Sequence, residues 1–379
     1  MKKAVLLYML LAGMSLSAAV FSGAFEGGLS LNPLSQSPWI ECGIDALFTG
    51  QLDFSSNITV KAGMSLKLGD MGFFIPVLDK SASIGFEHLS VQYYLPLTEF
   101  QHVFSAFSGR DAAFGGDVHL QQYIGAPPIQ SRFLRSAVGI PEYGIYDING
   151  TGLSYVLKFP SPQALGVFAY WNVEEEINYL SFDVRFSARW GKGIFDFWGG
   201  ASSVMGRTRI GDNSVPALVT PVGFRAGVTG VFGNTYNTHV FVQAAILDFG
   251  VKMPAVSLDN FFLFVEPRLV FGFSQITLSF FSLPSDYGEN RLLNVKPLGA
   301  AVTMVISNAD WQDMEVGITV SGSSMRDLNK LEPALHIMPF AAIKAGGGEF
   351  VLNAVFQPLM YNNLAELFTF SAGYKVIIQ

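Results

Sequence analysis

Charged side chains recur at alternate positions along apolar stretches of this chain, where they could bind an ion or a polar solute. A charge that faces lipid costs about 2–4 kcal/mol at the centre of a bilayer, so each one should face water or an opposite charge. Two roles therefore stay open: contact with a solute in a water-filled interior, or ion pairs between neighbouring strands. The candidates of this group are Arg185, Arg225, Glu266 and Arg268.

The segment 111–149 supplies the second group of candidates. It is the longest stretch without alternation, and it is rich in charges and turn residues. A loop of this length in a compact protein is usually functional or disordered. It could narrow a pore, lie outside as a solvated loop, or form a recognition surface. Its candidates, with the residue just before it, are Arg110, Asp117, His119, Arg132 and Arg135.

Motifs for catalysis, metal binding and nucleotide binding are absent from the sequence. The five histidines are scattered, and no His-Glu-x-x-His run occurs. No Walker loop, nucleotide glycine fingerprint or nucleophile elbow is present. We therefore expect no enzyme activity, no catalytic residues, no metal and no cofactor. Without residues 1–19 the formal charge is 21 minus 30, or −9, which argues against a nucleic-acid partner.

The elements that must position these residues alternate with a period of two. In 58–68 apolar residues alternate with polar ones such as Lys61 and Lys67, and 180–190 alternates in the same way. Several runs reach about 10 residues, the length that a tilted strand needs to cross a membrane. A membrane helix needs about 20 apolar residues, and the best stretch, 261–281, is interrupted by Glu266, Pro267 and Arg268.

Composition agrees with membrane strands. Half of the residues are hydrophobic and 14% are charged, whereas soluble proteins average about 25% charged residues. We predict an all-β fold, a transmembrane antiparallel up-and-down β-barrel of about 16 strands (range 14–18), over residues 51–379. Residues 20–50 form extra strands or a plug. Predicted outer loops are 69–82, 111–149, 204–220, 250–260, 284–295 and 322–334, and short turns separate them.

The first residues have the pattern of a secretory signal peptide, assigned to 1–19. A basic Met1-Lys2-Lys3 precedes an apolar stretch from Ala4 to Leu16, and small residues at 17–19 suit a signal peptidase. The apolar stretch of about 13 residues is too short to span a bilayer.

The last residues, Ser371 to Ile378, resemble the C-terminal assembly signal of outer-membrane barrels. The pattern is a polar residue, a glycine two positions on and then alternating hydrophobic residues, although the chain ends in Gln379 and not in an aromatic residue. The resemblance implies the outer membrane of a diderm bacterium, contact with outer-membrane lipid, and recognition of this strand by the barrel-assembly machinery.

A second resemblance concerns Gly109-Arg110 and the aromatic-glycine pair Phe114-Gly115. This spacing is similar to that of trimeric diffusion porins, in which the following loop folds inward and narrows the barrel. It implies a channel for small hydrophilic solutes and a homotrimer. Two alternatives remain. One is a transporter of hydrophobic compounds similar to the long-chain fatty acid channels, with 20–50 as its N-terminal hatch. The other is a surface adhesin or structural barrel without transport.

Overall fold

The structure is a computed structural model of the chain. It describes residues 20–33, 40–69, 81–97, 99–129, 131, 133–134, 144–174, 177–210, 213–234, 237–249, 260–284, 296–307, 314–325, 332–345, 347–362 and 367–378. The segment assigned to the signal peptide, 1–19, lies outside these residues.

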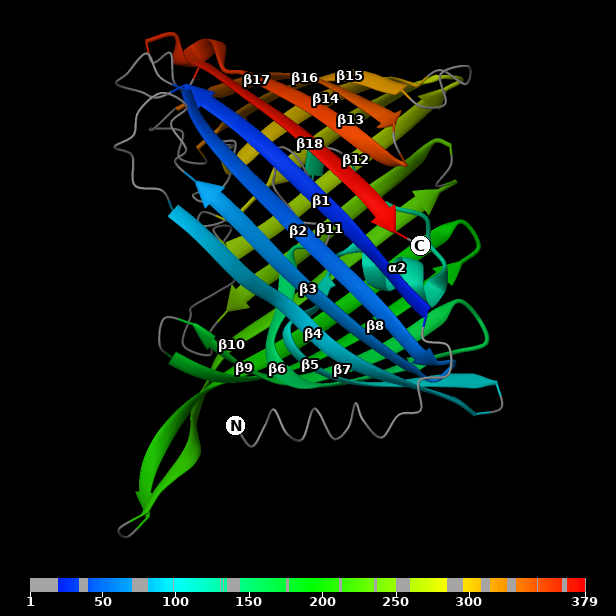
Figure 1. The fold of residues 1–379 in the computed structure, drawn as a ribbon, viewed down its shortest axis with the longest axis vertical. Helices are drawn as coiled ribbons and strands as arrows, with labels where there is room; N and C mark the ends of the chain where they lie inside the picture. The colour runs from blue at the N-terminus through cyan, green and yellow to red at the C-terminus, as the bar shows by residue number, and fades with distance from the viewer. Residues whose placement is uncertain are drawn as a thin grey trace.

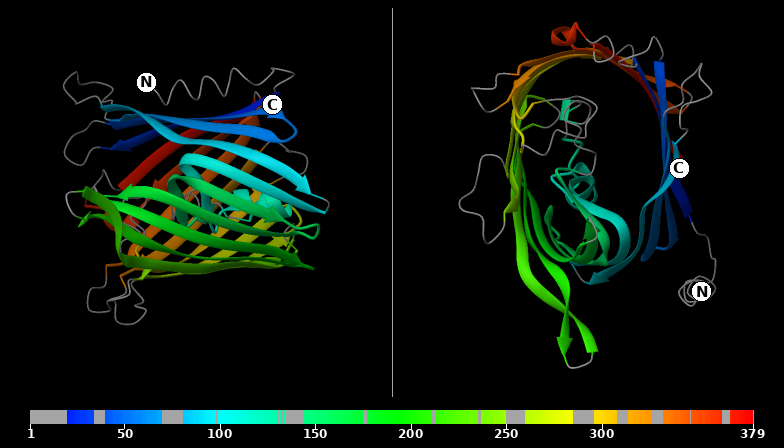
Figure 2. Two further views of the ribbon diagram at one scale, coloured as in Figure 1. Left: turned by 90° about the horizontal axis from the view of Figure 1, so that it is seen from below. Right: turned by 90° about the vertical axis from the view of Figure 1, so that its left-hand side faces the viewer.

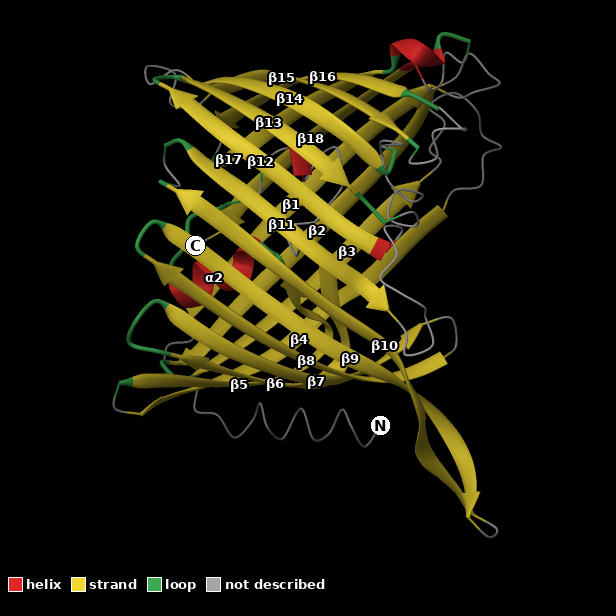
Figure 3. Cartoon of the chain, turned by 180° about the vertical axis from the view of Figure 1, so that it is seen from behind, coloured by secondary structure: helices red, strands yellow, loops and turns green. Residues whose placement is uncertain are grey.

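Eighteen antiparallel strands form one closed sheet (Figures 1 and 3). Each strand pairs with its neighbours in sequence, and the last strand closes the ring by pairing with the first. The strands are β1 (Val20–Pro33), β2 (Ile40–Ser55), β3 (Ile58–Gly69), β4 (Ser81–Leu97), β5 (Phe100–Phe114), β6 (Tyr146–Lys158), β7 (Gln163–Glu174), β8 (Ile177–Trp190), β9 (Gly193–Ile210), β10 (Asn213–Gly233), β11 (His239–Phe249), β12 (Phe261–Phe271), β13 (Ser274–Ser282), β14 (Leu298–Ser307), β15 (Met314–Ser324), β16 (Ala334–Ala345), β17 (Gly348–Phe356) and β18 (Phe368–Ile378). Among the residues that the structure describes, the helices are α2 (Asp117–Ile124) and the short 3₁₀ helix η4 (Pro358–Met360).

The predicted barrel architecture is confirmed, but the structure has 18 strands, which is the upper end of the predicted range, and not about 16. The additional pair comes from residues 20–50, because β1 pairs with β18 and β2 pairs with β3. This segment is therefore part of the barrel wall and does not form a plug. Its alternation is diluted by glycines, which explains why its strands are hard to recognise in the sequence.

The predicted outer loop 204–220 is also wrong. β9 continues to Ile210 and β10 begins at Asn213, so most of this stretch is a paired two-stranded ribbon. It projects beyond the rim of the barrel in Figure 1. Two register shifts, at Leu218/Thr220 and Pro221/Gly223, interrupt the pairing and obscure the period of two.

Burial along β8 is inverted relative to a strand of a soluble protein. On β8, Phe182 and Val184 are exposed, whereas Asp183 and Arg185 between them are fully buried. Strands alternate in this way when apolar side chains face lipid and polar ones face the interior. No helix in the described part of the chain is long and apolar enough to span a membrane.

Phenylalanine rings on the outer face cover neighbouring glycines. Phe25 lies over Gly27 and Phe232 over Gly230, and a Cβ on either glycine would come within 2.9–3.3 Å of the ring. Glycine has no side chain to cover its own backbone, and a ring that lies over it shields that backbone instead. This packing accounts for part of the unusual content of 39 glycines and 34 phenylalanines.

Candidate functional site: a segment that crosses the lumen

After β5 the chain turns into the barrel. We call residues 115–134, as far as they are described, the lumen segment. Figure 2, which looks along the barrel in its right-hand view, shows this part of the chain inside the ring of strands, closer to the green and yellow strands than to the blue ones. The turn depends on Gly115, which has a φ of +70°. A Cβ there would lie 2.2 Å from Nε2 of Gln243, the atom that donates a hydrogen bond of 3.2 Å to the Gly115 carbonyl.

Arg185 anchors the start of the lumen segment to β8. Its guanidinium donates to the carbonyl of Ala113 at 2.7 Å and, at 3.5 Å, to that of Gly116. The same group makes two bonds to the Asp196 carboxylate, of 2.8 and 2.7 Å, and Ser187 donates to that carboxylate as well. Arg185 and Asp196 are fully buried. A buried ion pair is tolerated when such hydrogen bonds replace the lost water.

A second ion pair bridges across one strand. Arg225 on β10 donates two bonds, of 2.8 and 2.6 Å, to Asp183 on β8. Between them, in register with both, lies Gly200 of β9. A Cβ at Gly200 would lie 1.7 Å from Oδ1 of Asp183, so the pair exists because this position has no side chain. Arg225 also donates to the Tyr170 hydroxyl at 3.0 Å.

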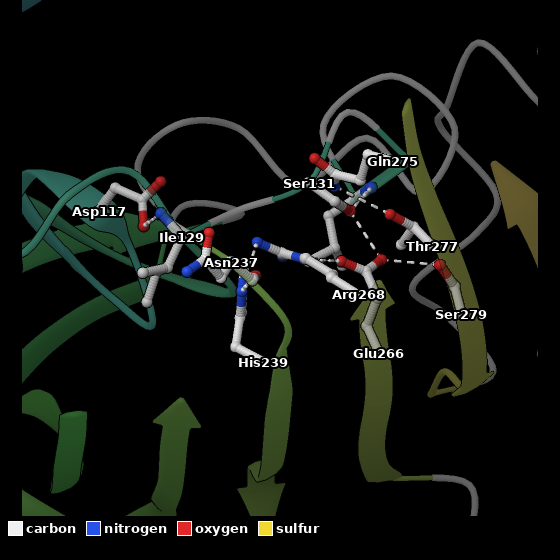
Figure 4. Close-up of polar contacts among 11 residues, drawn as sticks. Asp117, Ile129, Ser131, Asn237, His239, Glu266, Arg268, Gln275, Thr277 and Ser279 are labelled. Atoms are coloured by element: carbon white, nitrogen blue, oxygen red, sulfur yellow. Dashed lines mark hydrogen bonds and ion pairs between the residues drawn. The ribbon is translucent and has the colours of Figure 1, made fainter. Parts of the chain in front are cut away.

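Glu266 on β12 holds the far end of the lumen segment (Figure 4). Its Oε2 accepts hydrogen bonds from Ser131 of the segment at 2.8 Å and from Ser279 on β13 at 2.7 Å. Its Oε1 accepts from Arg268 at 2.6 Å. The segment thus reaches from the β8–β9 wall to the β12–β13 wall.

An apolar core fills the space between the lumen segment and this part of the wall. Phe114 stacks on Trp198 with ring centroids 4.8 Å apart, and Phe133 contacts Phe264 and Phe281. The residues of the segment and its entry that are at most 1% exposed are Phe114, Leu120, Ile129, Phe133 and Leu134. The side chains that pack against them come from the barrel wall, on strands between β5 and β16, and point inward. This corrects the expectation that polar faces line the whole interior.

Helix α2 lies within the lumen segment and presents buried polar groups. Asp117 accepts the backbone N–H of Ile129 at 3.1 Å, which ties the two ends of this stretch together. The His119 ring packs on Tyr123, and its Nε2 is buried with no hydrogen-bond partner among the residues that the structure describes. Burial, and secondly the nearby Arg185 charge, hold the pKa of His119 well below its usual 6.5. The imidazole is therefore neutral.

The structure brings most of the sequence candidates together. Arg185, Arg225, Glu266 and Arg268 are buried in ion pairs, and Asp117 and His119 lie in the lumen segment. Their geometry is that of structural pairs and not of groups exposed to solute. Arg110 is half-buried, 2.9 Å from Asp147 and 3.8 Å from Glu87. Arg132 and Arg135 lie outside the described residues.

Sequence reasoning missed several residues that carry the arrangement. Gln243 fixes the inward turn, Ser131 makes the far contact, and Phe133 inserts into the apolar wall. The sequence does hold a signal for Gln243, a polar residue that alternates with apolar ones in β11. It holds none for Ser131, whose partner is 135 residues away.

Metal ligands do not cluster in the described part of the chain. No group of three or more His, Cys, Asp or Glu side chains there could hold an ion.

Comparison with known proteins gives the fold. No protein-family model matches the chain, and no curated protein sequence is similar to it. Among solved structures, Wzi of Escherichia coli has a TM-score of 0.50 at 10% identity, covering 99% of this chain and 88% of that one. It is described as an outer-membrane protein involved in group 1 capsule assembly and as a carbohydrate-binding β-barrel.

Two further structures are similar at lower scores. A mutant porin of Rhodopseudomonas blastica has a TM-score of 0.47 at 11% identity, covering 95% of this chain and all of that one. OmpT of Vibrio cholerae, with loop L8 deleted, has a TM-score of 0.42 at 11% identity, covering 96% and 100%. The closed antiparallel sheet, its apolar outer surface and the likeness to Wzi show that this chain has the fold of an outer-membrane β-barrel.

Proposed function

We propose that the protein is a passive channel for small hydrophilic solutes, narrowed by the lumen segment. One observation carries the proposal: a segment between two transmembrane strands folds inside the barrel and is fixed to both walls, at Arg185 and at Glu266. Such a segment reduces the open cross-section without closing the whole ring. No enzymatic step is part of this function.

The packing of the segment favours a fixed filter over a gate. Burying a large apolar side chain stabilises by about 1.5–3 kcal/mol, so four of them contribute roughly 9 kcal/mol. In the lumen segment, Leu120, Ile129, Phe133 and Leu134 are at most 1% exposed. Breaking a single hydrogen bond to a carboxylate, such as that from Ser131 to Glu266, removes only about 1.5–3 kcal/mol. The segment should therefore stay in place while solutes pass.

Conductance in planar lipid bilayers tests the proposal. The folded barrel should give discrete open channels, and a variant in which 117–129 is replaced by a short Gly-Ser linker should conduct more. Folding of both proteins is checked by the shift in gel mobility between unheated and heated samples. A correctly folded wild type without conductance would contradict the channel function.

A barrel without transport is the second candidate, because the buried charges on β8, β9, β10 and β12 are paired with one another and are not open to a solute. Wzi, the similar structure, is described as binding carbohydrate. This candidate predicts no conductance and retention of a capsule-type glycan by the intact barrel. The fatty-acid-type transporter loses its structural basis, because the residues that would form its hatch are β1 and β2.

A further inference from the structure

The barrel interior has two unlike halves. On β8 to β12 the inward side chains are buried beneath the lumen segment, for example Asp183, Arg225 and Phe264. We call the inward faces of β17, β18, β1, β2 and β3 the seam wall, because they flank the β18–β1 pair that closes the ring. Apart from Thr59 and Gly63, the inward residues described there are half-buried or exposed.

The inward direction of the seam wall follows from its contacts and its register. Gln122 of α2 approaches the Tyr94 hydroxyl at 3.5 Å, and Tyr94 donates to Gln92, which pairs with Thr59 of β3. The face of β3 that carries Thr59 and Lys61 is therefore the interior one. The opposite face of these strands carries exposed apolar residues such as Phe48 and Met64, as a lipid-facing surface should.

Charges of opposite sign lie opposite each other on the seam wall and on the adjoining strand β16. Lys344, Glu349, Lys375 and Glu26 lie in register on β16, β17, β18 and β1. The Lys375 ammonium is 3.5 Å from the Glu26 carboxylate, and these side chains stay 33% and 53% exposed. Asp45 and Lys67 are likewise directly opposite each other and exposed.

The geometry points to a solute path along the seam wall, with a preference for solutes that are uncharged or carry both charges, such as amino acids. This inference rests on the proposed channel function and names its route and its solute class. The inward residues named above on β8 to β12 are buried and cannot contact a solute. The seam wall, by contrast, presents amide, hydroxyl and charged groups to the interior. The potentials of opposite charges a few ångströms apart largely cancel at longer range, and salt screens the remainder beyond the Debye length of about 8 Å, so these groups bind a dipolar solute without excluding either ion.

Cysteine accessibility tests the route. In a Cys42→Ser background, Ser371→Cys and Gln51→Cys place a thiol on the seam wall, where both native residues are half-buried. Ala245→Cys and Thr303→Cys are matched controls, since both native residues point inward but are 3% exposed. A charged methanethiosulfonate reagent should reduce conductance by about half at the two seam positions and leave the controls unchanged, because added bulk obstructs only the path itself. All variants are first checked for folding by gel mobility.

The solute class is tested in the same bilayers. In a potassium chloride gradient the reversal potential should stay near zero, and vesicles containing the protein should swell in glycine as fast as in a neutral polyol of similar size. Loss of conductance at the control thiols and not at the seam, or a strong preference for one ion, would overturn the inference. If the wild type does not conduct at all, the proposed function itself fails, which is a separate result.

Discussion

Replacing Gly200 with alanine should break a buried ion pair through a single methyl group. The added Cβ would lie 1.7 Å from Oδ1 and 2.6 Å from Cγ of Asp183, so the carboxylate must move. Asp183 now accepts two bonds from Arg225, and both side chains are nearly inaccessible to water. Breaking a buried pair by disturbing one partner costs about 3–5 kcal/mol. We expect Gly200→Ala to lower the free energy of unfolding by about 3 kcal/mol.

Urea unfolding of the barrel in phospholipid vesicles, followed by tryptophan fluorescence, measures this loss. Gly322→Ala is the matched control, because Gly322 also lies within a strand and a Cβ there meets no atom within 4 Å. That change should be neutral or stabilise by less than about 1 kcal/mol. A double-mutant cycle with Asp183→Ala should show strong coupling, since the methyl group no longer has a carboxylate to displace. Equal effects of Gly200→Ala and Gly322→Ala, or additivity in the cycle, would refute the reasoning.

Three other predictions concern the lumen segment and the seam. Ser131→Ala should cost about 2 kcal/mol of unfolding free energy, because the lost bond goes to the Glu266 carboxylate, and should leave conductance unchanged, whereas a large rise in conductance would contradict the fixed filter. The imidazole of His119 stays neutral in the native state but takes up a proton in the unfolded state, so the free energy of unfolding should fall as the pH drops below the unfolded pKa of about 6.5. Urea unfolding at pH 7.5 and pH 5 should show this loss for the wild type and a smaller loss for His119→Gln. Exchanging the charges of the seam pair, as Glu26→Lys with Lys375→Glu, should preserve folding on heated and unheated gels better than Glu26→Lys alone, which places like charges opposite each other.

Period-two alternation was sufficient to predict the barrel and most of its strands, because the order of apolar and polar residues within each strand indicates which face meets lipid. The stretch 180–190, for example, lies within β8, and its charged residues all point inward. Residues 20–50 and 204–220 were harder, since glycines in the first and register shifts in the second weaken the alternation.

The site was predictable in its members but not in its geometry. Alternation shows that Arg185 and Glu266 face the interior, yet whether they meet water or protein depends on where a distant segment folds. That depends on contacts such as Gln243 with Gly115, which are 128 residues apart in the chain. Periodicity is local, so it carries no information about such contacts. The signal peptide, the homotrimer and recognition by the assembly machinery stay predictions.

The apolar core inside the barrel bears on how the chain folds. Most of its wall comes from the middle of the sequence, β5 to β14, whose strands pair with immediate neighbours, while the ring is completed by the two ends of the chain. Local pairing is entropically cheaper to form than pairing between distant segments. The middle strands can thus gather around the lumen segment first, and joining β1 to β18 then encloses an interior that is already packed.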